Sequence, residues 1–147
     1  MKMSTLHLMP LALVLPACAG HNDASQNQDL TQYVNTLIGT DFTGNTYPGA
    51  QMPFGMVQLS PDNGIPGWDR IAGYFYPDST IAGFSHTHLS GTGAGDLYDI
   101  SFLPVMLPVR ESDAPLGVHS RFSHDDETAT AGYYQVRLTD YDIDVEI

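Results

Sequence analysis

Residues 133–147 read YYQVRLTDYDIDVEI, and this stretch decides the fold class. Its alternating apolar positions are Tyr134, Val136 and Leu138, followed by Ile143, Val145 and Ile147. Because successive side chains of a strand point to opposite faces, each set of three lies on one face. The two sets are separated by the polar segment 139–142. The pattern predicts an antiparallel β-hairpin with one buried face.

Shorter apolar runs predict further strands at 56–59, 73–76, 81–88 and 100–105. Turn-forming residues follow or separate them, at 61–64, at 77–79 and at Pro108. Beyond the N-terminal leader, no stretch combines a helical period with helix caps. The sequence therefore predicts an all-β protein, most simply an antiparallel β-sandwich. Because the last residue, Ile147, falls inside a predicted strand, we expect the chain to be a truncated part of a larger domain.

The N-terminus predicts export. Lys2 precedes an apolar stretch at 6–15, which is too short to span a bilayer and suits a signal peptide. The stretch ends in Leu15-Pro16-Ala17-Cys18, which is similar to a bacterial lipobox. We expect residues 1–17 to be a lipoprotein signal peptide and Cys18 to carry the lipid anchor in the cell envelope. The alternative is an ordinary signal peptide that is cleaved near residue 17 or 19.

Residues 18–29 are small and polar without a period, so we expect a tether, followed by one domain at 30–147. The single cysteine excludes an internal disulfide and a zinc site built on cysteines.

The net charge of −12, from 17 acidic and 5 basic residues, restricts the partners. Nucleic-acid binding requires a basic surface, which this chain lacks. An anionic lipid surface is disfavoured for the same reason, so we expect membrane contact only through the lipid anchor. A neutral ligand or a cation remains compatible with this charge.

The densest group of polar residues is GFSHTHLSGTGAGD at 83–96. On a strand, His86 and His88 would face the same side. Such a pair can bind a metal with one further ligand, such as Asp96 or Asp99, or it can support a polar pocket through hydrogen bonds. The glycines do not match a nucleotide-binding spacing, so they indicate sharp turns or a close approach to a ligand.

The second group is PGWDR at 66–70. The indole of Trp68 could stack on a pyranose, while Asp69 and Arg70 could hydrogen-bond its hydroxyls. Alternatively, Trp68 caps the core and the two charged residues form a solvated pair. The acidic cluster at 125–127 is predicted to be solvated surface, because nothing in it sets one acid apart as protonated.

Several segments together resemble the N-terminal domain of glycoside hydrolase family 92. They are YVNTLIGT at 33–40, YPGA at 47–50, MPFGMVQLSPD at 52–62, GYFY at 73–76, GFSHTHLSGTG at 83–93, residues 99–104 and GYY at 132–134. The match begins near residue 31 and runs to the end of the chain. The two long strings, at 52–62 and 83–93, are the most specific.

The resemblance implies a galactose-mutarotase-like supersandwich, incomplete at its C-terminal end, that packs on a helical catalytic domain. It implies a calcium-dependent, inverting exo-α-mannosidase, α-1,2-directed, that acts on N-glycans or mannans in Bacteroidota. The catalytic acid and base and the calcium would lie mainly in the helical domain, so no catalytic residue and no metal ligand is expected here. Trp68, Asp69, His86 and His88 are the expected substrate-binding residues, with the histidines in a supporting role.

Three hypotheses follow. The first is an inactive N-terminal part of an α-mannosidase that faces a mannose-containing glycan. The second is a stand-alone carbohydrate-binding lipoprotein. The third is a metal-binding module centred on His86 and His88.

Overall fold

The computed structural model describes residues 28–65, 67–91, 93, 97–108 and 117–147. Their elements are, in order, η1 (Leu30–Tyr33), β1 (Ser60–Asp62), η2 (Trp68–Arg70), β2 (Thr80–Ile81), β3 (Gly83–Ser85), β4 (Ser120–Arg121), η3 (His124–Asp126), β5 (Glu127–Thr130), β6 (Tyr133–Leu138) and β7 (Ile143–Glu146). The η elements are single-turn 3-10 helices, and all strand pairs are antiparallel. The predicted all-β class is confirmed. The described residues include no helix with the length and apolar character of a membrane span.

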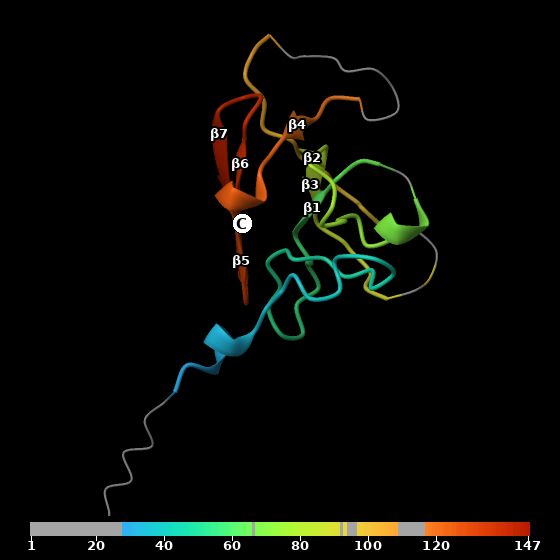
Figure 1. Ribbon diagram of the computed structural model, residues 1–147, viewed down its shortest axis with the longest axis vertical. Helices are drawn as coiled ribbons and strands as arrows, with labels where there is room; N and C mark the ends of the chain where they lie inside the picture. Colours follow the sequence, from blue (N-terminus) through green and yellow to red (C-terminus); the bar gives the residue numbers. More distant parts are fainter. Residues whose placement is uncertain (1–27, 66, 92, 94–96, 109–116) are drawn as a thin grey trace, which may run out of the picture.

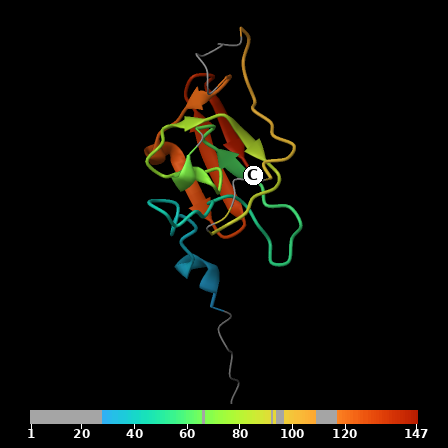
Figure 2. The same cartoon turned by 90° about the vertical axis from the view of Figure 1, so that its right-hand side faces the viewer.

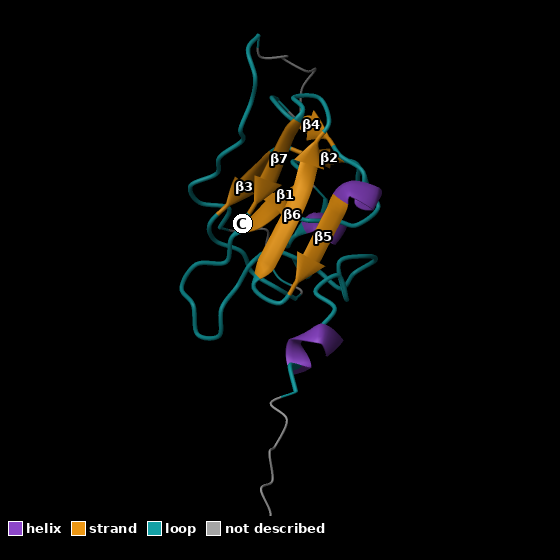
Figure 3. Cartoon of the chain, turned by 90° about the vertical axis from the view of Figure 1, so that its left-hand side faces the viewer, coloured by secondary structure: helices purple, strands orange, loops and turns teal. Residues whose placement is uncertain are grey.

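The strands lie in two layers (Figures 1 and 3). One layer is the sheet β5–β6–β7, and the other holds the pairs β1–β3 and β2–β4. Figure 2 shows the same two layers from the opposite side, with the segment that leads from η1 to β1 below them. The signal peptide, Cys18 and most of the expected tether lie outside the described residues.

The predicted hairpin is present as β6 and β7. Val136 pairs with Val145, and Leu138 pairs with Ile143. Inward and outward residues alternate along β6, and its inward side chains are fully buried. This face packs against Tyr74, Ile81, Phe84 and Phe122 of the other layer. Burial of each such side chain contributes about 1.5–3 kcal/mol, so the apolar alternation of one strand holds the two layers together.

One predicted strand, at 56–59, and the turn predicted after it differ from the observed structure. Of the residues expected to form a turn at 61–64, Pro61 and Asp62 instead belong to β1, which pairs with β3 through Pro61 and Phe84. Residues 56–59 form only an isolated bridge, between Leu59 and Ala50, and Met56 is exposed. Proline has no N–H group to donate, but it is tolerated in β1 because this strand pairs with β3 alone among the described strands and so has one unpaired edge.

Three other runs are shorter as strands than predicted. Residues 73–76 are not a strand, although Tyr74 is buried, because the side chain of Asn63 takes the hydrogen bond of the Phe75 N–H. The run at 81–88 is a strand only at Ile81 and at 83–85. The run at 100–105 contributes a single bridge to β3. Apolar character alone predicted regular hydrogen bonding between strands in these runs. In the structure, side-chain or loop contacts take its place.

The interpretation of the acidic cluster was wrong for one residue. Asp125 and Asp126 are exposed, but the side chain of Glu127 is only 2% exposed. Its carboxylate accepts hydrogen bonds from the hydroxyls of Tyr74, at 2.9 and 3.0 Å, and Tyr134, at 2.6 Å. Tyr134 belongs to β6 and Tyr74 to the loop between η2 and β2, so Glu127 joins the three-stranded sheet to this loop through a buried polar contact.

His124 completes this contact. Its Nδ1 lies 2.6 Å from Oε2 of Glu127, and its Nε2 lies 2.6 Å from the carbonyl oxygen of Tyr76. Both ring nitrogens thus lie beside oxygen atoms, one of a carboxylate and one of a backbone carbonyl. His124 thereby connects Glu127 to the backbone at Tyr76.

Candidate functional site

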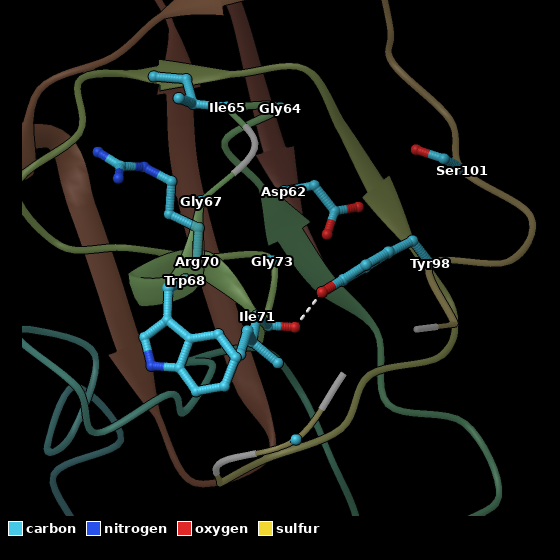
Figure 4. A pocket seen from close by; sticks show the side chains of 11 residues that line it. Asp62, Gly64, Ile65, Gly67, Trp68, Arg70, Ile71, Gly73, Tyr98 and Ser101 are labelled. Carbon is cyan, nitrogen blue, oxygen red and sulfur yellow. Dashed lines mark hydrogen bonds between the residues drawn. The ribbon is translucent and has the colours of Figure 1, made fainter. Parts of the chain in front are cut away.

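A pocket of about 540 Å³ opens where the loop after β1 meets η2. Its wall is made by residues of three segments (Figure 4): Asp62, Gly64, Ile65, Gly67, Trp68, Arg70, Ile71, Gly73, Gly93, Tyr98 and Ser101. This volume lies in the usual range for small-molecule sites, about 300–1,000 Å³. The wall combines an aromatic and aliphatic surface with a small number of polar groups, as such sites generally do.

Trp68 is the aromatic part of the pocket. It starts η2 after Gly67, and its side chain remains 64% exposed. Figure 4 shows the indole beside Ile71 at the edge of the pocket. The prediction that Trp68 caps the core is excluded by this exposure, whereas an indole open to the pocket is available for stacking.

Asp62 is the carboxylate of the pocket, and His88 holds it in place. Nε2 of His88 lies 3.0 Å from Oδ1 of Asp62. Nδ1 of the same ring donates to the carbonyl oxygen of Gln58 at 2.6 Å, and Oγ of Ser85 lies 3.2 Å from Nε2. The side chain of His88 is fully buried, so it reaches the pocket only through Asp62.

Gly73 allows this arrangement. Its φ of +86° is a left-handed conformation that glycine adopts without strain. A Cβ at this position would overlap Oδ1 of Asp62, and it would approach Tyr98 to 3.1 Å and His88 to 3.2 Å. The hydroxyl of Tyr98 donates to the carbonyl oxygen of Ile71, which ties the 97–101 segment to the end of η2 (Figure 4).

Arg70 pairs with Asp78 instead of with its neighbour Asp69. Its Nε and Nη2 donate to the two oxygens of Asp78 at 2.6 and 2.5 Å, and its guanidinium lies 4.4 Å from the centre of the Phe75 ring. The hydrogen bonds with Asp78 raise the pKa of Arg70 above its usual value. The predicted solvated pair is therefore wrong, and the ion pair fixes η2 and with it Trp68.

The other predicted binding residues lie around the pocket. Asp69 is partly buried but is not part of the pocket wall. His86 lies beyond the end of β3, where its Nδ1 contacts the carbonyl oxygen of Ile100 at 2.6 Å and its ring contacts Phe102. The two histidines thus have different neighbours, contrary to the shared strand face expected from their spacing. Asp62 and Tyr98 were not predicted, although Asp62 ends the string at 52–62.

The described residues offer no evident metal site. They contain no group of three or more His, Cys, Asp or Glu side chains that could hold a metal ion. In the described part of the chain, His86 and His88 therefore lack the further ligand that the metal-module hypothesis requires.

Comparison with protein families gives a match over residues 33–147 to the glycosyl hydrolase family 92 N-terminal domain. The chain belongs to this family. The matched range includes Asp62, Trp68 and His88, so the whole pocket lies within the family domain.

Solved structures of family 92 mannosidases are similar to this chain in sequence and in fold. The structure of a family 92 α-mannosidase from Bacteroides thetaiotaomicron matches with 46% identity and a TM-score of 0.75, over 81% of this chain and 17% of that one. The same mannosidase in complex with mannoimidazole matches with the same identity and TM-score. A family 92 inverting mannosidase from the same bacterium is 31% identical with a TM-score of 0.53, over 76% of this chain and 15% of that one.

A curated relative from the fungus Arthroderma benhamiae, named an uncharacterized secreted glycosidase, is 29% identical over 136 residues. The match covers 88% of this chain and 17% of the relative. The family 92 chain described here thus spans about a sixth of the length of these relatives.

Proposed function

We propose that the pocket at Trp68 holds the terminal mannose of a glycan, and that the chain is the N-terminal, sugar-facing domain of an exo-α-mannosidase. The single observation that carries this proposal is the 64% exposed indole at the edge of a pocket whose wall also contains a carboxylate. The mannoimidazole complex of a 46% identical mannosidase supports the same class of ligand.

The chemistry of the pocket suits a neutral sugar. The face of Trp68 would stack on C–H groups of the pyranose, as indoles do in apolar recognition. Oδ1 of Asp62 is occupied by His88, so Oδ2 remains to accept a sugar hydroxyl in a charge-assisted hydrogen bond. Ser101 adds a second hydrogen-bonding group at the opposite wall. The rigid support of η2 and His88 presents these groups in one fixed arrangement.

Hydrolysis would need groups that are not among the described wall residues of this pocket. Inverting glycosidases use a general acid and a general base that are about 6.5–9.5 Å apart. Among the described wall residues, Asp62 is the only carboxylate, and its partner is a histidine. We therefore infer that the acid, the base and the calcium ion belong to another part of the parent enzyme. The inference extends to an α-1,2 preference on N-glycans or mannans and to inactivity of this chain alone.

The unique tryptophan gives a direct test. Titration of α-1,2-mannobiose into the purified chain should shift the Trp68 emission to shorter wavelength with a millimolar dissociation constant, while cellobiose should leave it unchanged. Trp68→Ala should abolish binding of mannobiose in isothermal titration calorimetry, and Trp68→Phe should retain a part of it. No release of mannose is expected, with or without calcium. An emission that does not respond to mannobiose would contradict the proposal.

We propose further that the chain is exported and anchored through a lipid on Cys18. The apolar stretch at 6–15 and the name of the secreted fungal relative support export. Metabolic labelling with a radioactive fatty acid in a bacterial host should label the chain, and Cys18→Ser should remove the label. Labelling that persists in Cys18→Ser would contradict the anchor.

A further inference from the structure

A second pocket, of about 700 Å³, lies between the segment around η1 and the loop at 46–53. Ser90 and the β5–β6 turn at Ala131 and Gly132 complete its wall. The wall residues differ entirely from those of the Trp68 pocket. The second pocket is therefore a separate hollow and not an extension of the first.

The wall of the second pocket is polar but uncharged. As far as the described residues form it, the wall includes no Asp, Glu, Lys, Arg or His, although the chain as a whole is strongly acidic. Hydroxyl groups, one amide and a few apolar side chains take their place. Burial raises the pKa of Tyr47, which keeps its hydroxyl neutral. An ionic ligand would lose its hydration here without gaining a partner of opposite charge. A neutral ligand rich in hydroxyls would exchange its bonds with water for hydrogen bonds with the wall.

The polar groups are arranged to exchange hydrogen bonds with such a ligand. The hydroxyl of Tyr47 donates to Oε1 of Gln51 at 2.8 Å, which orients the amide. Nε2 of Gln51 donates to no described residue. The hydroxyl of Thr46 donates to the carbonyl oxygen of Ile38 at 2.8 Å, so its oxygen can still accept. One donor and one acceptor thus belong to the same wall as the apolar side chains of Met52 and Pro53, which suits the mixed faces of a hexose.

His88 contacts one residue of each pocket. The rings of Tyr47, in the second pocket, and His88 are 5.0 Å apart between centroids. Nε2 of His88 in turn contacts Asp62, in the Trp68 pocket, at 3.0 Å. The segment that follows His88 contributes to both pockets, since Ser90 lines the second pocket and Gly93 lines the Trp68 pocket. Neighbouring units of one oligosaccharide could therefore occupy both.

We propose that the second pocket is a subsite for a further neutral hexose of the glycan whose terminal unit is held at Trp68. This inference rests on the proposed function, because it takes the ligand class from the Trp68 pocket. The second subsite would use Tyr47 and Gln51 to bind a sugar unit beyond the terminal one.

The probe is α-mannotriose, titrated into the ¹⁵N-labelled chain and followed by chemical-shift mapping. The trisaccharide should shift the Trp68 indole signal and the amides of residues 46–51, while methyl α-mannoside at the same concentration should shift only the Trp68 region. Shifts at Trp68 without shifts at 46–51 would overturn the second subsite and leave the proposed function standing. Shifts at neither place would overturn both.

A double variant tests whether Tyr47 and Gln51 contribute to binding at the second subsite. Gln51→Leu with Tyr47→Phe removes the amide and the hydroxyl but keeps the ring against His88. It should weaken binding of mannotriose about fivefold, an ordinary value for the loss of neutral hydrogen bonds, and leave that of methyl α-mannoside unchanged. An unchanged affinity for mannotriose would overturn the role of these residues. The mapping on the unmodified chain stays decisive even where the variant fails to fold.

Discussion

Asp62 and His88 lie 26 positions apart in the chain and are joined by a hydrogen bond of 3.0 Å between Oδ1 and Nε2. Each belongs to one of the two long strings that are typical of family 92, at 52–62 and 83–93. The strands that carry these strings pair directly, because β1 and β3 are antiparallel neighbours. The bond turns one carboxylate oxygen toward the histidine and leaves the other for the pocket.

Asp62→Asn should therefore lower the affinity for mannobiose about tenfold, because a charge-assisted hydrogen bond contributes about 1.5–3 kcal/mol. The fold should survive, since the amide can still hydrogen-bond to His88. Asp69→Asn is the matched control, because Asp69 is next to Trp68 but not in the pocket wall. The affinity of this variant for mannobiose should stay within twofold of that of the unmodified chain. Calorimetric titration of mannobiose into both variants shows which of the two carboxylates contributes to binding. A larger loss in Asp69→Asn would restore the prediction made from the sequence.

Gly73→Ala should destabilise the chain more than Gly91→Ala. Both glycines have positive φ values, +86° and +92°, so both variants carry a backbone strain of about 1–2 kcal/mol. Only at Gly73 would the new methyl group also meet Asp62, Tyr98 and His88, while Gly91 has open space around it. Urea unfolding followed by circular dichroism should show the difference, and Gly73→Ala should also weaken mannobiose binding. Equal losses in the two variants would show that the contact at Gly73 relaxes without cost.

The part of the fold that could be predicted is the part with a strict period. The hairpin at 133–147 was predicted because apolar side chains alternate along both strands. Their common face is fully buried on β6 and partly buried on β7, and a register shift by one residue would expose it. Glu127 was misjudged because it follows two exposed acids. The alternation along β5 indicates the burial of Glu127. Glu127 and Ala129 lie on the less exposed side of this strand, opposite to Thr128 and Thr130.

The pocket could be predicted only in part. Trp68 was singled out because a single tryptophan in a loop rich in Gly and Pro, beside a carboxylate and a guanidinium, suits sugar recognition, although a core-capping role was equally compatible with the sequence. Asp62 was missed because its position depends on the pairing of two very short strands, and Arg70 was paired with its neighbour when the structure joins it to Asp78. Such partners are set by the course of the chain through loops, for which local sequence carries little information.

The ion pair between Arg70 and Asp78 should contribute measurably to stability. Asp78 is 8% exposed and accepts two hydrogen bonds from the guanidinium, so Arg70→Lys, which loses the paired geometry and the contact with Phe75, should cost about 1–2 kcal/mol. Arg137→Lys is the control, because Arg137 pairs with exposed Asp142 and Asp144 and such pairs contribute at most about 1 kcal/mol. Urea unfolding gives both values. If the two variants lose the same stability, the Arg70 pair has no special role.

Stability should also fall at alkaline pH through the buried tyrosines. Burial, assisted by the Glu127 carboxylate, raises the pKa of Tyr74 and of Tyr134 above the usual value of 10.0. A raised folded-state pKa means that the native chain holds these protons more tightly than the unfolded chain. The contribution is therefore complete below about pH 10 and is lost as the pH rises from there toward the folded-state values, by up to about 1.4 kcal/mol per pH unit for each tyrosine.

The free energy of unfolding, measured in urea at intervals from pH 8 to pH 11, should accordingly drop steeply above pH 10. The double variant Tyr74→Phe with Tyr134→Phe should start lower, because Glu127 loses two donors at a cost of about 1.5–3 kcal/mol each, but its alkaline slope should be shallower. Tyr33→Phe should match the unmodified chain, because Tyr33 is 69% exposed. A double variant with the original slope would mean that the alkaline loss comes from groups other than the tyrosines that bind Glu127.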